Sequence, residues 1–138
     1  MTIDGAVLGR LKAVSAITAI VGSGSSARIY AESLPQHPVL EAITFTQISA
    51  ERVHAFGSDP GLVRARFQLD AWGNTWEESR DLADAIRGDG AASALSRWSG
   101  TQDTTVVDDI LLDNELPTFE AESGSYRTTQ DFLIWYHE

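Results

Sequence analysis

The sequence contains no cysteine among its 138 residues. This absence excludes a disulfide framework, a thiolate nucleophile and a zinc site made of cysteine ligands. It also agrees with folding in a reducing cytoplasm. A chain of this length can bury a hydrophobic core without such cross-links. We therefore expect residues 1–138 to form a single domain.

Positive charge is also scarce, because 10 lysine and arginine residues stand against 20 aspartate and glutamate residues. The formal net charge of −10 argues against a nucleic-acid-binding protein, since neutralising phosphates requires clustered cations. It does not exclude a conduit for DNA. A negative wall repels the phosphate backbone, so DNA would pass along it without binding.

Long hydrophobic runs are missing as well. The N-terminal residues 1–22 are apolar in places, but Arg10 and Lys12 interrupt them and no small-residue cleavage site closes a hydrophobic run. No segment approaches the ~20 apolar residues that a membrane-spanning helix needs. We therefore expect neither a signal peptide nor contact with a membrane.

The N-terminal pattern predicts an amphipathic helix from Asp4, a good N-cap residue, to Val21, with Gly22 as its stop. Many of its apolar residues lie on one wide arc that includes Leu11, yet Ile20 lies on the other side. A helix that is apolar on two sides is either central to the domain or shared with a neighbouring chain. The sequence leaves both possibilities open.

The clearest pattern in the chain is a strand followed by a capped helix. Residues 61–72 alternate between apolar and polar side chains, which predicts a half-buried strand. Thr75, followed three residues later by Glu78, is the capping-box pattern and predicts a helix that Gly88 ends. We expect the apolar side chains of this unit to form the core, namely Val63, Phe67, Leu69, Trp76, Leu82 and Ile86.

Strand patterns recur elsewhere, in residues 27–31, 42–49, 104–112 and 126–137. The last of these segments is apolar on both faces near its end, which predicts a central strand or a covered outer face. The expected order of elements is α-β-β-β-α-β-β. Strands that follow one another directly favour antiparallel pairing. We therefore predict an α+β fold with a mainly antiparallel sheet and two principal helices packed on one face.

Three connecting segments complete this prediction. Residues 50–60 are expected to form a hairpin loop that is longer than usual, and long ordered loops often serve contact or function. Residues 113–125 are expected to form an acidic loop. Residues 91–98 are expected to add a helical turn or two, with Leu95 and Trp98 packed against the body.

No group of side chains forms a convincing catalytic or metal-binding constellation. His37, His54 and His137 are scattered without the spacing of metal ligands. Asp108 and Asp109 are adjacent on a predicted strand, so they point to opposite faces and cannot act together in acid–base chemistry. We therefore expect no enzymatic activity, no metal and no cofactor.

Arg64 and Arg66, together with Arg52, are the one concentrated basic feature. The first two lie on the polar face of the predicted strand. They either form exposed cross-strand ion pairs, which contribute little stability, or meet the acidic surface of another subunit or partner.

A series of motifs in a fixed order carries a family resemblance. The chain contains ARIYA at residues 27–31, ITFTQIS at 43–49, VHAF at 53–56, the long motif GLVRARFQLDAWGNTWEESRDLADAIR at 61–87, and DDILLDNELPTFEAESGSYR at 108–127 followed by DFLIWYHE at 131–138. In this order it resembles the tail completion proteins of long-tailed bacteriophages, which are also called tail terminator or head-to-tail joining proteins.

The resemblance implies a structural virion protein at the head-proximal end of the tail, made in the cytoplasm of a bacterial host. Such a protein forms a homo-hexameric ring that caps the tail tube protein and stops its polymerisation. It also offers the docking surface for the head-completion or connector protein, and DNA passes through its lumen without specific binding. Whether the particle is an infectious phage, a prophage remnant or a gene transfer agent stays open.

Ring subunits need two different contact patches, because each subunit meets its two neighbours through unlike surfaces. We expect one patch on the first helix and the last strand, with Ile20 and Trp135. We expect the other on the hairpin loop and the strand next to it, with Arg52, His54, Phe56, Arg64 and Arg66.

Two alternatives remain at this point. The same body could serve an oligomeric cytoplasmic adaptor or a toxin–antitoxin-like interaction module. It could also serve a small hydrolase or isomerase whose site has no recognisable motif.

Overall fold

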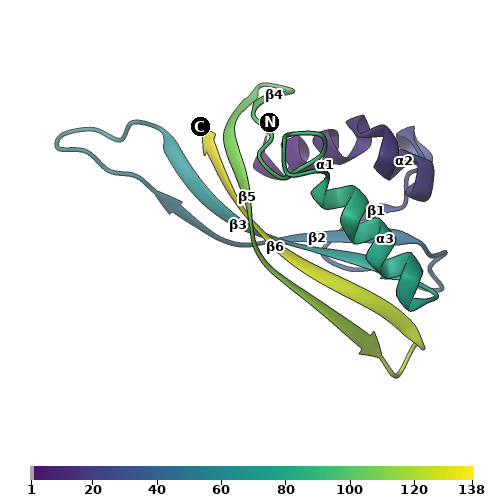
Figure 1. The fold of residues 1–138 in the computed structure, drawn as a ribbon. Helices are drawn as coiled ribbons and strands as arrows, with labels where there is room; N and C mark the ends of the chain where they lie inside the picture. Colours follow the sequence, from purple (N-terminus) through teal and green to yellow (C-terminus); the bar gives the residue numbers. More distant parts are fainter. Residues whose placement is uncertain (1) are drawn as a thin grey trace.

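The computed structural model describes residues 2–138, which form a curled six-stranded sheet and three α-helices that gather on one of its sides (Figure 1). The fold is therefore mixed α+β. The helices are α1 (Ile3–Ala13), α2 (Ser15–Val21) and α3 (Trp76–Arg87), with the short 3-10 helix η1 (Gly24–Ser26) after α2. The strands are β1 (Ile29–Ala31), β2 (Ala42–Arg52), β3 (Leu62–Gly73), β4 (Gly100–Gln102), β5 (Thr105–Glu120) and β6 (Ser125–His137).

The sheet has the strand order β1-β2-β3-β6-β5-β4. The β1–β2 pair is parallel, and every other neighbouring pair is antiparallel. Strand β6 lies between β3 and β5, which confirms the prediction of a central strand and explains its two apolar faces. In Figure 1 the β2–β3 hairpin projects at one end of the molecule and the β5–β6 hairpin at the other. The order of elements differs from the prediction, because the first helix is divided and β4 is added.

The alternation predicted for residues 61–72 is confirmed. The side chains of Val63, Phe67 and Leu69 have no exposed area, while Arg64 and Arg66 between them are partly exposed. The buried face packs against α3 and continues on β6, where alternate residues are also buried. The core therefore lies between the sheet and the helices.

Helix α3 begins and ends where the sequence predicts. The hydroxyl of Thr75 accepts a hydrogen bond from the backbone N–H of Glu78 at 3.1 Å. The carboxylate of Glu78 accepts from the N–H of Asn74 at 2.9 Å. Gly88 ends the helix with φ +80°, a conformation that strains any residue with a Cβ.

The prediction that Trp76 belongs to the core is wrong, because 57% of its surface is exposed. Side chains of a helix lean toward its N-terminus. As the first residue of α3, Trp76 therefore points past the helix end, whereas Leu82 and Ile86, further along the same face, are fully buried.

The single N-terminal helix predicted from Asp4 to Val21 is also corrected. Thr2, not Asp4, is the N-cap, and its hydroxyl accepts from the N–H of Gly5 at 3.3 Å. Val14 has extended backbone angles and divides the helix into α1 and α2. The break gives α2 a new direction, so apolar residues of both helices reach the core. The apolar residues that would lie on two sides of one continuous helix are thus divided between two helices.

The segment between α3 and β4 forms turns and bends where a helical turn was expected, and Ala92 and Arg97 in it have positive φ. The expected packing of Leu95 and Trp98 is nevertheless confirmed. Leu95 is buried, and the guanidinium of Arg10 lies 4.6 Å from the centre of a Trp98 ring. The Arg10 side chain also donates to the Ala94 carbonyl, which ties this segment to α1.

The acidic loop predicted for residues 113–125 is a strand for most of its length. Strand β5 continues to Glu120, and a short turn at residues 121–124 joins it to β6. Pro117 is compatible with this strand. Beyond the short pairing with β4, β5 pairs only with β6 among the described strands, so its other edge is open. A proline is tolerated where its missing N–H would face an open edge. The predicted hairpin loop is likewise shorter, since β2 runs to Arg52 and the connection spans residues 53–61.

Within residues 2–138, the helices are all too short or too polar to cross a membrane.

Candidate functional site

Two surfaces carry most of the side chains predicted for contact with other chains. One is the hairpin tip, defined here as residues 51–60, which comprise the last two residues of β2 and most of the connection to β3. The other is the open face, defined as the side of the sheet that faces away from the helices, to which Arg64, Arg66 and Trp135 point.

The hairpin tip is exposed along its whole length. The Phe56 side chain is 109% exposed relative to a reference residue, so within the described chain it has no packing partner. The turn around it is ordered by a bridge between Ala55 and Ser58, with Gly57 at φ +78°. An ordered turn that presents a bare aromatic ring is a feature expected of a contact surface.

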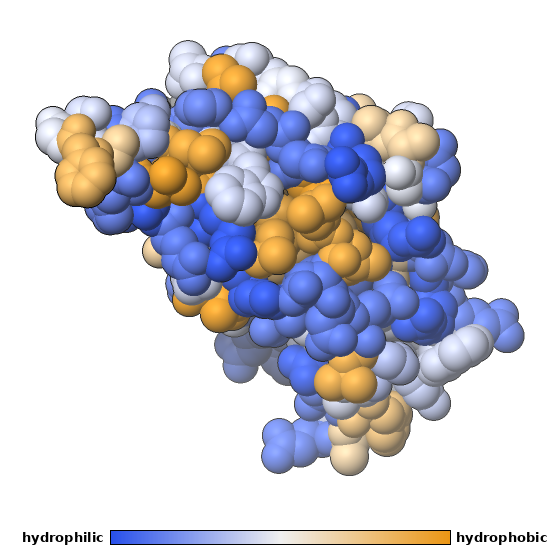
Figure 2. Space-filling view, turned by 60° about the vertical axis from the view of Figure 1, so that its left-hand side comes forward, coloured by the Kyte–Doolittle hydropathy of each residue, from blue (hydrophilic) through white to orange (hydrophobic). Residues whose placement is uncertain are grey.

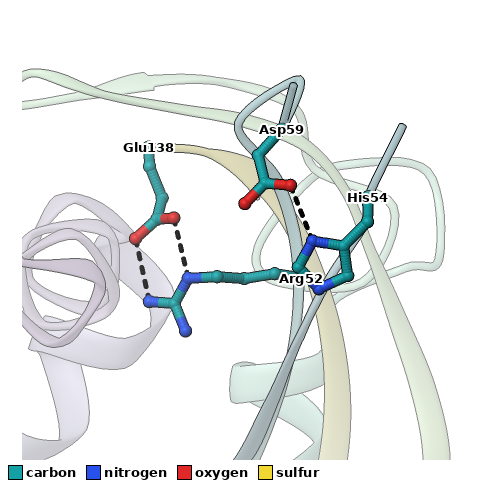
Figure 3. Close-up of polar contacts among 4 residues, drawn as sticks. All are labelled: Arg52, His54, Asp59 and Glu138. Carbon is teal, nitrogen blue, oxygen red and sulfur yellow. Dashed lines mark hydrogen bonds and ion pairs between the residues drawn. The ribbon is translucent and has the colours of Figure 1, made fainter. Parts of the chain in front are cut away.

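An ion pair and a histidine–carboxylate contact hold the base of the hairpin tip (Figure 3). The guanidinium of Arg52 makes two hydrogen bonds of 2.9 Å to the carboxylate of Glu138. These bonds hold the pKa of Glu138 below its ordinary value, so the pair persists at neutral pH. The Nδ1 atom of His54 lies 2.6 Å from a carboxylate oxygen of Asp59. The first contact ties the end of β2 to Glu138, the residue after β6, and the second joins residues on the two sides of the turn. Together they fix the direction in which the tip projects.

The open face carries apolar side chains that no helix covers. Leu111 and Leu133 are neighbours on β5 and β6, and both are half-buried, as is Trp135 on the same face. The guanidinium of Arg64 lies 5.7 Å from the centre of a Trp135 ring. Viewed from the side of the hairpin tip, Figure 2 shows apolar groups gathered in the middle of the surface between hydrophilic ones. An apolar centre within a polar rim is the usual anatomy of a protein interface.

The two arginines of β3 form cross-strand ion pairs on this face. Arg64 contacts Glu51 at 2.5 Å, while Arg66 contacts Asp113 at 2.6 Å and Asp131 at 3.5 Å. One of the two possibilities that the sequence left open is therefore present. Exposed pairs of this kind contribute little stability, so they leave the arginines available for a second role. Contact with another chain stays a prediction.

The structure does not bring the two residues of the other predicted patch together. Ile20 lies on α2, half-buried against the core cluster on the helical side of the sheet. Trp135 alternates with the buried Ile134 and Tyr136, so it points to the open face. The sheet therefore separates the two side chains.

Sequence reasoning missed a third surface, which we call the aromatic groove. It lies where the start of α3 meets the far end of the β5–β6 hairpin. It is lined by Trp76, Ser79, Pro117, Thr118, Phe119, Tyr126, Arg127 and Thr128. It was missed because residues 113–125 were expected to be a loop. The signal that could have found it is the spacing of Pro117 and Phe119, which are two residues apart and therefore lie on the same face of a strand.

The described residues, 2–138, contain no group of three or more histidine, aspartate or glutamate side chains that could hold a metal ion. The features that stand out are the exposed aromatic and apolar side chains of the three surfaces described above.

Comparison with known proteins identifies the family. The family model described as "Tail completion protein gp17" matches residues 5–137. The chain belongs to this family. This confirms the resemblance drawn from the sequence motifs and makes the chain a structural tail protein of a bacteriophage or a related particle.

The fold of this tail completion protein also occurs in a solved particle. It matches a chain in a structure described as the virion of a native gene transfer agent particle, with a TM-score of 0.65. The match covers 96% of this chain and 92% of that chain at 13% sequence identity. At this identity the likeness concerns the fold. No curated protein matches the chain.

Proposed function

We propose that this tail completion protein is a tail terminator. It forms a homo-hexameric ring on the head-proximal end of the tail tube, stops further addition of tube subunits and provides the docking surface for the head-completion or connector protein. The observation that carries the proposal is the hairpin tip, whose fully exposed Phe56 has no packing partner within the described chain of a tail completion family member.

Charge supports the proposed passage of DNA through the ring. The chain has a formal net charge of −10, and its exposed cations are largely neutralised by carboxylates of the same chain. An acidic wall repels the phosphate backbone, which favours transit without binding.

The proposed contacts use both surfaces described above. Arg52, His54 and Phe56 on the hairpin tip would meet one neighbour. Trp135, with Arg64 and Arg66 beside it, offers an apolar and cationic surface to another chain on the open face, and aromatic and arginine side chains dominate the energetics of many interfaces. Ile20 is proposed as a contact on the helical side.

Tail length tests the function directly. In cells that produce the particle without this chain, tail tubes are expected to exceed their normal length, and filled heads are expected to lack tails. Supplying the chain in trans should restore both, as judged by electron microscopy of negatively stained lysates. If tails of normal length are joined to heads in the absence of the chain, the proposal is contradicted. That result is the one expected for an adaptor or an enzyme that acts elsewhere.

Exchanging the charges of Arg64 and Glu51 tests whether Arg64 only pairs with Glu51 in its own chain or also contacts another chain. The change Arg64→Glu disrupts the pair with Glu51, whereas the double change Arg64→Glu with Glu51→Arg restores a pair of opposite polarity. If Arg64 contacts another chain, both variants should form at least about tenfold less ring by native mass spectrometry, since losing an interfacial arginine often weakens binding by more than 1.4 kcal/mol.

The folding of the two variants serves as the control. An exposed ion pair is worth about 0 to 1 kcal/mol, so the unfolding free energy of the monomer should change little. Normal ring formation by the double variant would show that Arg64 acts only within its own chain.

A further inference from the structure

The aromatic groove has the shape and chemistry of an acceptor for one aromatic ring. Trp76 and Phe119 line it and are 57% and 53% exposed. The rings of Phe119 and Tyr126 lie 4.9 Å apart at an angle of 49°, which fixes one side of the groove. Two large apolar side chains left exposed at one place indicate a surface that another group covers.

The Nε atom of Arg127, which also lines the groove, is buried without a hydrogen-bond partner among residues 2–138, whereas the two buried hydroxyl groups of the groove have partners. The hydroxyl of Ser79 donates to the carbonyl of Ala71 at 2.9 Å and lies 2.9 Å from the hydroxyl of Thr128. Both side chains are buried. An apolar ring placed over the hydroxyl groups of Ser79 and Thr128 would therefore leave both of them with a partner, and would avoid the penalty for covering these two groups.

The size of the groove fits a phenyl ring. Its volume is about 190 Å³. A closed apolar cavity of roughly 150 Å³ is large enough to hold benzene. The chain itself carries one unpartnered phenyl ring of this kind, on Phe56, at the opposite end of the molecule from the β5–β6 turn (Figure 1).

Electrostatics also favour the hairpin tip as the occupant. Glu77, Glu120 and Glu122 lie in the segments that form the groove, and Arg127, which lines it, pairs with Glu120 at 2.7 Å, so carboxylates outnumber cations around it. Two copies of a chain with a net charge of −10 repel each other through most of their surfaces. Residues 53–58 at the turn contain no carboxylate, and the nearby carboxylates of Asp59 and Glu138 contact His54 and Arg52, so the turn can approach the groove with little like-charge repulsion.

We propose that Phe56 of one subunit inserts into the aromatic groove of the next subunit. The two surfaces differ and lie at opposite ends of the chain, so the contact is head-to-tail and repeats around a ring. The inference rests on the proposed ring function, for which it names the self-contact.

Two single variants test the contact. Phe56→Asp removes the ring from the hairpin tip but keeps the groove, and Trp76→Asp places a carboxylate in the groove but keeps the tip. Neither side chain is buried, and an aspartate in the first turn of α3 is favourable for the helix. Val39→Asp, at an exposed apolar residue outside both surfaces, is the matched control.

Native mass spectrometry and analytical ultracentrifugation should show rings for the wild type and for Val39→Asp. Each test variant alone should be monomeric, with self-association weakened at least about tenfold, as expected when a buried aromatic anchor is lost. A mixture of the two variants retains one intact tip and one intact groove. It should therefore form a one-to-one heterodimer that does not grow.

Several results would overturn the contact. They are ring formation by Phe56→Asp or by Trp76→Asp, a mixture without heterodimers, or a wild-type chain that stays monomeric at every concentration. The terminator function is judged separately by tail length in producing cells. Normal control of tail length by the Phe56→Asp variant would contradict this contact without contradicting the terminator function.

Discussion

Replacing Phe67 with alanine is expected to lower the free energy of unfolding by about 3 to 5 kcal/mol, the usual range for removing a fully buried phenylalanine. The Phe67 side chain has no exposed area, and it lies opposite the equally buried Phe132 on β6. Close packing around the ring leaves a cavity when the ring is removed, because the sheet cannot collapse into the space. Urea denaturation followed by circular dichroism, at a concentration where the chain is monomeric, measures the change.

Phe56→Ala is the matched control, since it makes the same chemical change at a fully exposed ring. Its effect on monomer stability should stay within about 0.5 kcal/mol, as for most surface substitutions. Equal effects of the two changes would mean that the alternation along β3 does not define the core.

The second large effect is expected for Ile17→Ala, which should lower the free energy of unfolding by about 2 to 5 kcal/mol. Ile17 is fully buried on α2, after the break at Val14 has redirected the chain toward the core. The sequence left open whether the N-terminal helix is central or shared with a neighbour, and the burial of Ile17 assigns this part of it to the core. Thermal unfolding of the monomer, monitored by calorimetry, tests the assignment.

Ile20→Ala provides the comparison within the same helix. Ile20 is only half-buried, so the same type of truncation should cost less than half as much as at Ile17. If Ile20→Ala proved the more damaging of the two in the monomer, the orientation of α2 would be wrong.

The pairing of β3 with β6 connects the two surfaces of the proposed ring contact, the hairpin tip and the aromatic groove. Strands β3 and β6 pair without a register shift from Leu62 opposite His137 to Gly73 opposite Tyr126. The hairpin tip follows one end of this ladder, and the aromatic groove lies at the other. The continuous hydrogen bonding of two central strands therefore holds both surfaces at a fixed separation, which a ring of constant size requires.

The sequence by itself determined the unit from Leu62 to Gly88. Its strand and helix are specified by local periodicity and by a cap whose hydrogen bonds span a few residues, so no distant contact was needed to predict them. The same local motifs, in order, also identified the family. The lack of cysteine and of a cation cluster constrained the function in the same way, because composition does not depend on the fold.

Only the tertiary structure decided the features that depend on residues far apart in the chain. Val14 breaks the first helix because both halves must reach one core, and β5 runs through Pro117 because its outer edge is unpaired there. Trp76 leaves the core because it points past the helix end, and it lines the aromatic groove together with Phe119 and Tyr126 from the β5–β6 hairpin. Local propensity carries no information about such neighbours, since packing against distant strands overrides it.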